Sequence, residues 1–205
     1  MKLYQSVGPN PRTVKMFIAE KGLDVARVDI DLMGGENRQE PYTSRVNPAG
    51  QTPALELDDG SCLTEITAIC EYLEEHTPNP PLIGTTAEER ANTRMWTRRV
   101  DLKVAEPMAN GFRFGEGLAM FESRLRCLPE ASAGLKAVAQ DGIAWIEENF
   151  QGPWVAGGRF TLADILLFSF MDFGAVVGQP IDPKNRKVVD WYERVKARPS
   201  AAASA

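Results

Sequence analysis

Histidine is almost absent from this chain of 205 residues, where His76 is the only one. It lies two residues before Pro78, where a helix is expected to end, so we interpret it as a helix-end residue. A serine or cysteine hydrolase normally needs a histidine base beside its nucleophile. The composition therefore disfavours hydrolase chemistry.

Cysteine is also rare, and the three cysteines, Cys62, Cys70 and Cys127, form no C-x-x-C pair. This spacing argues against a disulfide framework, a zinc site and a dithiol redox centre. We therefore expect buried thiols and no metal site.

The chain lacks a basic cluster and a long apolar run. Its net charge is −5, and lysines and arginines are dispersed, with only short pairs such as Arg98-Arg99, so no nucleic-acid partner is indicated. No apolar run approaches membrane-spanning length, and the first five residues lead into glycine, asparagine and proline. We therefore expect no membrane partner and a cytoplasmic location.

Strand-like and helical patterns alternate over the first 78 residues. Residues 2–6 and 25–30 have the pattern of strands separated by a helix, and a short helix is expected within 34–47. A hairpin turning at 58–60 and a helix beginning near Glu65 complete a β-α-β-α-β-β-α unit. This order predicts a thioredoxin-like domain.

The second half of the chain is predicted to be all helical, which makes the fold class α+β. Three prolines after His76 mark a linker. We place a first domain at 1–78, the linker at 79–86 and an all-α domain at 87–205. One buried helical stripe recurs every four residues, at Trp96, Val100, Val104 and Met108.

Two further features of this half bear on packing. Thr161 and Asp164 have the spacing of a capping box before an almost wholly apolar, and therefore central, helix over 162–177. The tail 201–205 carries no packing signal.

The most informative segment runs from Asn47 to Glu75. Pro53 has no amide hydrogen, so it is best placed at the first residue of a strand, beside an exposed backbone edge at Thr52. If the bond between them is cis, Thr52 would offer both its amide and its carbonyl to an extended peptide. Glu65 stands at the start of the next helix, where a negative charge is favoured.

These motifs resemble those of the glutathione S-transferase family. The resemblance includes Gln51-Thr52-Pro53-Ala54-Leu55 and Leu63-Thr64-Glu65. It extends to the segments 9–12 (PNPR), 19–22 (AEKG) and 160–164 (FTLAD), and so spans the chain. It implies a glutathione transferase acting on a small hydrophobic electrophile, glutathione as co-substrate, and a homodimer.

The resemblance also implies which residues bind glutathione. Thr52, held by Pro53, pairs with the cysteinyl backbone, while Glu65 and the amide of Ile66 bind the γ-glutamyl end. Gln51 and Arg38 reach the glycyl carboxylate, although a solvated surface charge is an equal alternative for Arg38. The family usually has serine where this chain has Ile66, and losing that hydroxyl donor weakens binding by roughly 1.5 to 3 kcal/mol unless another group replaces it.

Catalysis requires the thiolate of glutathione. Lowering a thiol pKa by about two units from ~8.5 takes roughly 2.7 kcal/mol, more than the ~0.3 to 1 kcal/mol of an exposed helix N-terminus. We expect Asn10 to be the N-cap of the first helix and Pro11 its first residue. Alignment puts Gly8 where many members have the activating hydroxyl, and Ser6 is the nearest hydroxyl.

The predicted catalytic residues are therefore Asn10 and Ser6, acting with the helix terminus and a water molecule. Met108, Phe112 and Phe114 are candidates for the wall of a hydrophobic substrate slot, although such residues more often belong to a core than to a pocket. Two alternatives stay open: a non-catalytic glutathione- or partner-binding protein on the same fold, and a glutathione peroxidase.

Overall fold

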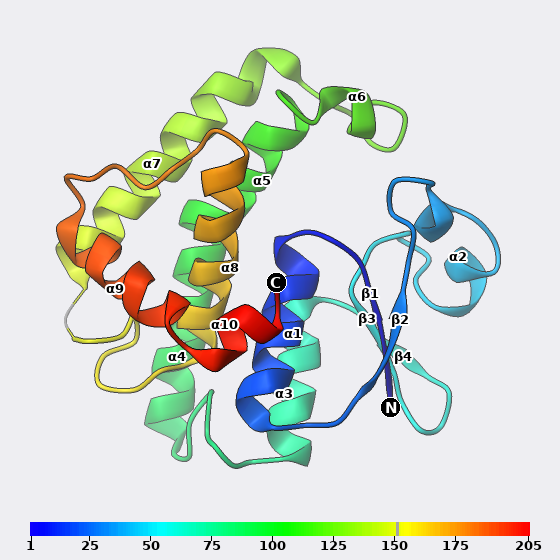
Figure 1. Ribbon diagram of the computed structural model, residues 1–205, viewed down its shortest axis with the longest axis horizontal. Coiled ribbons are helices and arrows are strands. Elements are labelled where there is room, and N and C mark those ends of the chain that lie inside the picture. Colours follow the sequence, from blue (N-terminus) through cyan, green and yellow to red (C-terminus); the bar gives the residue numbers. More distant parts are fainter. Residues whose placement is uncertain (151) are drawn as a thin grey trace. The chain divides into compact units, whose positions relative to one another are not determined.

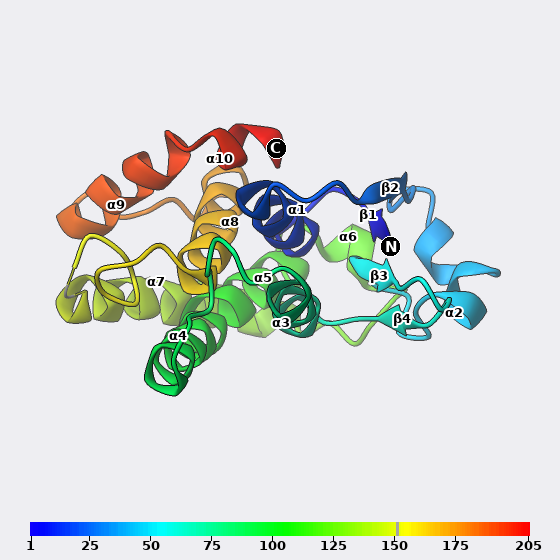
Figure 2. The ribbon, with the colours of Figure 1, turned by 90° about the horizontal axis from the view of Figure 1, so that it is seen from below.

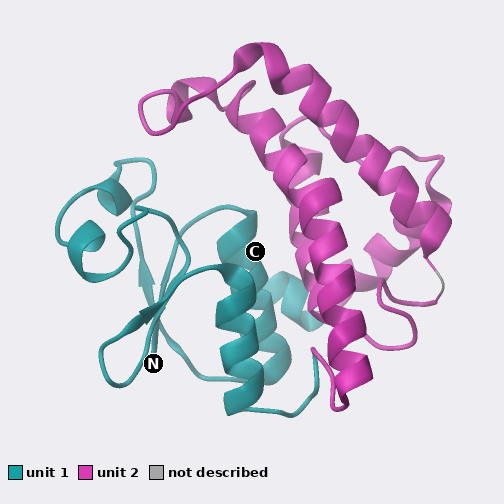
Figure 3. Ribbon diagram, turned by 180° about the vertical axis from the view of Figure 1, so that it is seen from behind, with its two compact units in different colours: residues 1–82, 199–205 teal, residues 83–198 magenta. Residues whose placement is uncertain are grey.

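The computed structural model describes residues 1–150 and 152–205, which form two compact units (Figure 3). Unit 1 comprises Met1–Leu82 together with Pro199–Ala205, and unit 2 comprises Ile83–Arg198. The division falls inside the predicted linker, 79–86. The last seven residues, by contrast, belong to unit 1 and not to the helical domain predicted at 87–205.

Unit 1 is built on a four-stranded mixed sheet with the strand order β2-β1-β3-β4. Its strands are β1 (Lys2–Gln5), β2 (Ala26–Asp29), β3 (Ala54–Glu56) and β4 (Cys62–Leu63). β1 runs parallel to β2 and antiparallel to β3, and Leu3 lies opposite Leu55. Both leucines are fully buried, so alternation along the strands gives the sheet one apolar face.

Helices cover both faces of this sheet. α1 (Pro9–Lys21) and α3 (Ile66–His76) lie side by side on one face, as Figure 1 and Figure 2 show. A short 3₁₀ helix, η1 (Glu36–Arg38), and α2 (Tyr42–Arg45) lie towards the other face. The element order confirms the predicted thioredoxin-like domain.

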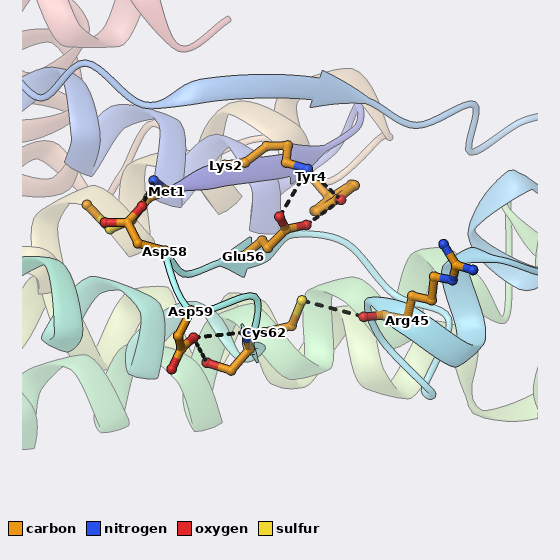
Figure 4. A network of polar contacts seen from close by, with 9 residues as sticks. Met1, Lys2, Tyr4, Arg45, Glu56, Asp58, Asp59 and Cys62 are labelled. Atoms are coloured by element: carbon orange, nitrogen blue, oxygen red, sulfur yellow. Dashed lines mark hydrogen bonds and ion pairs between the residues drawn. The ribbon is translucent and has the colours of Figure 1, made fainter.

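The outer face of the sheet carries a polar network (Figure 4). The hydroxyl of Tyr4 donates to Glu56 Oε2 at 2.6 Å, and Lys2 Nζ lies 3.1 Å from Glu56 Oε1. The bond to Glu56 raises the pKa of Tyr4. Tyr4 also packs edge-on against Tyr42, with ring centroids 6.0 Å apart.

A buried ion pair joins the ends of α1 and α3. Lys21 Nζ bonds to Glu74 Oε2 and donates to the carbonyls of Thr77 at 2.7 Å and Pro80 at 2.8 Å. The side chains of Lys21 and Glu74 are 0% and 2% exposed. Glu74 Oε2 also accepts from the amide of Leu82 at 3.2 Å, so the pair fixes the chain segment that leaves α3.

The C-terminal segment forms a helix, α10 (Pro199–Ala203), that packs on α1 (Figure 2). Arg12 Nη2 donates to the carbonyl of Ala201 at 3.3 Å, and the hydroxyl of Ser200 donates to Glu20. Ala201 is 3% exposed and Ser204 is fully buried. Residues 201–205 thus pack although the sequence carries no packing signal for them, because alanine and serine give no periodic pattern yet fit closely against a helix.

Unit 2 is all helical, as predicted. It contains α4 (Ala87–Val100), η2 (Asp101–Ala105), α5 (Glu106–Arg113), α6 (Leu118–Phe121), η3 (Pro129–Ala131), α7 (Ser132–Asn149), α8 (Leu162–Val176) and α9 (Arg186–Lys196). η2 is a π-helical turn between α4 and α5, and Pro107 lies in the first turn of α5, where a missing amide hydrogen is tolerated. The predicted stripe from Trp96 to Met108 is buried.

α8 is the central helix of unit 2, and the predicted capping box is present at its start. Asp164 is buried and accepts hydrogen bonds at 2.8 Å from the amides of Val155 and Thr161 and from Trp191 Nε1. Burial raises the pKa of Asp164 to about 6, against the lowering effect of these donors. Asp164 thereby ties three segments of unit 2 together.

Candidate functional site

The candidate peptide-binding residues lie in unit 1, around the loop that leads into β3. The bond between Thr52 and Pro53 is cis, the isomer on which the expected presentation of Thr52 depends. Within the part of the chain that the structure describes, neither the amide nor the carbonyl of Thr52 is engaged in a hydrogen bond. Thr52 is half-buried and Pro53 is buried, so an unpaired backbone position stands just before β3.

Ser6 lies directly beside Thr52. The two hydroxyl oxygens are 2.6 Å apart, and Ser6 Oγ also donates to the carbonyl of Val7 at 3.1 Å. This contact brings the end of β1 and the loop before β3 together across 46 residues of sequence. Because both partners of the Ser6 hydroxyl are protein groups, Ser6 positions Thr52 in this geometry.

The start of α1 differs from the sequence prediction. The helix begins at Pro9 with Gly8 as its N-cap, so Asn10 is not the N-cap but lies within the first turn. Pro9 and Pro11 have no amide hydrogen, and the amide of Arg12 donates to the carbonyl of Gly8 at 3.2 Å. The backbone amide of Asn10 is therefore the donor that the first turn leaves available.

The N-cap itself explains the difference. Gly8 has φ 119°, a backbone conformation that side chains disfavour. It lets the chain enter the helix two residues earlier than predicted, with Pro9 in the first turn, where proline is favoured. The first turn holds no acidic residue, so no carboxylate opposes the positive end of the helix dipole.

Glu65 caps α3 in a strained conformation. Its φ is 67°, and among the described residues it is the non-glycine residue with a positive φ. Such conformations cost about 1 to 3 kcal/mol and cluster at ligand sites. Glu65 is exposed and followed by the half-buried Ile66, whose amide is one of the donors that a helix start leaves free. A carboxylate and an amide donor thus stand together.

Gln51 and Arg38 are brought to one corner of the site. Both are exposed. A Cβ built on Gly50 would lie 2.8 Å from Arg38 Cδ, so the arginine side chain lies across Gly50, next to Gln51. A guanidinium and a carboxamide are suited to binding a carboxylate.

Three buried side chains that the sequence analysis did not single out support this corner. The hydroxyl of Tyr42 and Asn47 Nδ2 donate to the carbonyl of Gln51 at 2.7 Å and 2.8 Å, and Asn37 Nδ2 donates to the carbonyl of Gly50 at 2.6 Å. No local pattern marks Tyr42 or Asn37, because each acts on backbone outside its own helix, whereas Asn47 acts locally and also accepts from the amide of Ala49 at 3.0 Å. The only available signal is the presence of polar residues in a segment that must pack on a sheet.

The three hydrophobic candidates belong to unit 2. Met108 is fully buried and packs close to Gly174, so it is a core residue with no surface for a substrate. Phe112 and Phe114 are half-buried, and Phe112 packs edge-on against Phe121 and Phe173 with ring centroids 6.2 Å and 5.2 Å apart. Phe112 and Phe114 stay predictions.

The thiols of the chain itself are poorly suited to catalysis. Burial raises the pKa values of Cys70 and Cys62. Cys62 and Cys127 are half-buried, whereas Cys70 is buried as expected. In the described ranges, 1–150 and 152–205, no group of three or more His, Cys, Asp or Glu residues is placed to hold a metal ion, and no helix is both long and apolar enough to span a bilayer.

Comparison with known proteins supports the family suggested by the sequence. Residues 7–76 match the glutathione S-transferase N-terminal domain, and residues 119–199 match the glutathione S-transferase C-terminal domain. Glutathione S-transferase 2 of Saccharomyces cerevisiae is 31% identical over 196 residues, covering 94% of this chain and 84% of that protein.

Solved structures of glutathione transferases have the same fold as this chain. Gtt2 from Saccharomyces cerevisiae superimposes with a TM-score of 0.92 at 30% identity, covering 100% of both chains. A glutathione transferase homologue from Sulfitobacter with bound glutathione gives a TM-score of 0.80 at 25% identity, covering 98% of this chain and 96% of that one. With its thioredoxin-like domain followed by a helical domain, the chain belongs to the glutathione S-transferase family, in its cytosolic-type architecture.

Proposed function

We propose that this protein is a glutathione transferase that activates the thiol of glutathione at the start of α1 for attack on a hydrophobic electrophile. The observation that carries the proposal is Thr52, whose backbone amide and carbonyl are unpaired beside the end of β1. An extended peptide pairs with such an edge through its main chain. Glutathione is a peptide of this kind.

The groups around Thr52 match the ends of the tripeptide. Glu65 and the amide of Ile66 bind the amine and carboxylate of the γ-glutamyl residue, whereas Gln51 and Arg38 bind the glycyl carboxylate. The strained φ of 67° at Glu65 supports a binding role for its carboxylate. The sulfur then lies towards the start of α1, since Ser6 joins Thr52 to the chain that enters this helix.

The start of α1 stabilises the thiolate. The helix dipole contributes about 0.3 to 1 kcal/mol, or ~2 when partly buried, and the free amide of Asn10 adds a charge-assisted hydrogen bond of about 1.5 to 3 kcal/mol. Together these reach the roughly 2.7 kcal/mol that a shift of two pKa units requires. The thiol proton leaves to water, and the sulfur forms a bond to carbon as the leaving group departs with its electron pair.

The electrophile is a small hydrophobic molecule held by the partly exposed Phe112 and Phe114. Through its family the protein is a cytoplasmic homodimer with a role in detoxification. Gel filtration with light scattering tests the dimer, for which the expected mass is twice 22.6 kDa.

Two features of the sequence, Gly8 and Ile66, favour a second candidate, a glutathione-binding protein without transferase activity. Gly8 stands where many family members have a hydroxyl, and a Cβ at Gly8 would meet nothing within 4 Å. Ile66 lacks the hydroxyl donor of the usual serine. Neither of these differences from other family members removes the backbone edge at Thr52. The same site could therefore bind glutathione without activating its thiol.

Calorimetric binding of glutathione, thiolate absorbance at increasing pH, and conjugation of an activated aryl halide distinguish the candidates. We expect wild-type protein to bind glutathione, to lower its thiol pKa and to catalyse conjugation. Glu65→Ala should lose these properties. The matched control is Glu75→Ala, which removes an exposed carboxylate from the other end of α3 and should keep them.

Other outcomes of these measurements would distinguish the two candidate functions. Binding with an unshifted thiol pKa would support the non-catalytic candidate, and absence of binding would reject both. Asn10→Asp, which places a carboxylate beside the sulfur, should raise the thiol pKa of bound glutathione without abolishing binding. An unchanged thiol pKa in Asn10→Asp would argue that activation occurs elsewhere.

A further inference from the structure

We propose that two buried residues outside the binding surface position different parts of glutathione: Tyr42 sets the group that binds the cysteinyl residue, and Asn37 sets the group that binds the glycyl carboxylate. The proposal rests on the proposed function, in which Thr52 binds the middle of the tripeptide and Arg38 binds its glycyl end. Neither Tyr42 nor Asn37 touches the ligand in this scheme.

Tyr42 acts through the peptide unit between Gln51 and Thr52. Its hydroxyl donates to the carbonyl of Gln51 at 2.7 Å, and Asn47 Nδ2 donates to the same oxygen at 2.8 Å. A peptide unit is planar, and in its trans form the N–H points away from the C=O. Holding the Gln51 carbonyl inward therefore turns the amide of Thr52 outward, in the direction from which a peptide must pair.

The environment of Tyr42 suits this role. The residue is 4% exposed and packs with Ile30, Val46 and Ala54 in a small cluster on the outer face of the sheet. Burial raises the pKa of Tyr42, so its hydroxyl stays a donor throughout the physiological pH range. The Gln51 carbonyl has two donors, and removing one leaves it paired, so the fold should tolerate loss of the hydroxyl.

Asn37 acts on the corner of the site where Arg38 lies across Gly50, next to Gln51. It is 2% exposed in η1, and its Nδ2 donates to the carbonyl of Gly50 at 2.6 Å. η1 is itself anchored, because the amide of Asp31 donates to Glu36 Oε2 at 2.7 Å and the amide of Glu36 donates to the carbonyl of Asp31 at 3.0 Å. The bond from Asn37 therefore joins an anchored helical turn to the loop before Thr52.

Arg38 follows Asn37 directly in this turn. A Cβ on Gly50 would lie 2.8 Å from both the Asn37 carbonyl oxygen and Arg38 Cδ, so η1 and Arg38 approach Gly50 as closely as a glycine permits. Gly50 has φ 60°, a second reason for glycine at this position. The bond from Asn37 to Gly50 thus sets the distance between the Arg38 guanidinium and the exposed amide of Gln51.

The two roles predict different ligand selectivity, which calorimetry can measure with glutathione and with γ-glutamylcysteine, the dipeptide that lacks the glycyl residue. Asn37→Ala should raise the Kd for glutathione by about 3- to 10-fold, as expected for one hydrogen bond, and leave that for γ-glutamylcysteine within about 2-fold. Tyr42→Phe should raise both Kd values by a similar factor of about 3 or more. General loosening of the fold would weaken both ligands in both variants.

Two controls sharpen the test. Tyr4→Phe removes the hydroxyl of the tyrosine that packs edge-on against Tyr42 but bonds to Glu56, so it should leave both Kd values unchanged. If Asn37 acts through Arg38, adding Asn37→Ala to Arg38→Ala should change the Kd for glutathione by less than 2-fold. Should Asn37→Ala not fold, Asn37→Ser provides a smaller perturbation with the same expected selectivity.

The same selectivity in Asn37→Ala and Tyr42→Phe, or an unchanged Kd for glutathione in both, would overturn the inference. Failure of the proposed function can be distinguished from failure of this inference, because wild-type protein would then bind neither glutathione nor γ-glutamylcysteine.

Discussion

Replacing Lys21 with methionine should strongly destabilise unit 1. The side chain of Lys21 is fully buried, and its ammonium bonds to Glu74 and to the carbonyls of Thr77 and Pro80. Methionine fills a similar volume without a charge or a donor. The variant therefore leaves the carboxylate of Glu74, 2% exposed, without its compensating cation.

The expected loss follows from the cost of removing the cation from a buried ion pair. Removing one partner of a buried ion pair typically costs about 3 to 5 kcal/mol, most of it the desolvation of the charge that remains. The amide of Leu82 still donates to Glu74 in the variant. We therefore expect the loss of unfolding free energy to lie near about 3 kcal/mol. Lys21→Met/Glu74→Gln should recover at least half of it, because glutamine still accepts from Leu82 and carries no charge.

Urea unfolding measures this loss. All four tryptophans, at 96, 145, 154 and 191, belong to unit 2, so tryptophan fluorescence reports unit 2 while far-ultraviolet circular dichroism reports both units. Lys21→Met should lower the dichroism midpoint. A loss below about 1 kcal/mol, or a double variant less stable than Lys21→Met alone, would refute the reasoning from charge burial.

Further predictions concern pH, the loop before Thr52 and the C-terminal helix. Burial raises the pKa of Asp164 from 3.8 to about 6, so its contribution to folding is fully present below pH 3.8 and is lost as the pH rises through about 6. Between pH 4 and 7 this loss should be on the order of 3 kcal/mol in urea unfolding and absent in Asp164→Asn. Gly50→Ala should weaken glutathione binding in calorimetry at least 10-fold, since a Cβ would lie 2.8 Å from the Asn37 carbonyl oxygen and alanine disfavours φ 60°. Ala201→Glu should lower the melting temperature of unit 1 because Ala201 is 3% exposed, whereas the exposed Ala202 should accept glutamate; equal melting temperatures would argue against docking of α10 on α1.

Much of the fold could be predicted from the sequence because its signals are local. The hairpin before α3, the capping box of Asp164 and the apolar surface of α8 each depend on residues a few positions apart. The position of Glu65 at the start of α3 was predicted on the same basis and is confirmed.

The features that the sequence did not predict depend on distant contacts. Nothing near Ser6 indicates that its hydroxyl meets that of Thr52, 46 residues away. Nothing in a run of alanines and serines indicates that α10 packs on α1. The start of α1 was misplaced because Asn10 is a favoured N-cap residue, whereas Gly8 adopts the required backbone conformation.

The return of α10 to α1 has a consequence for biosynthesis. Unit 1 contains segments on both sides of unit 2 in the chain, so a ribosome must translate all of unit 2 before the outer face of α1 can be covered. During that interval the nascent thioredoxin-like domain exposes the surface that Ala201 and Ser204 later bury. Its final consolidation is therefore a late, long-range event rather than an early co-translational one.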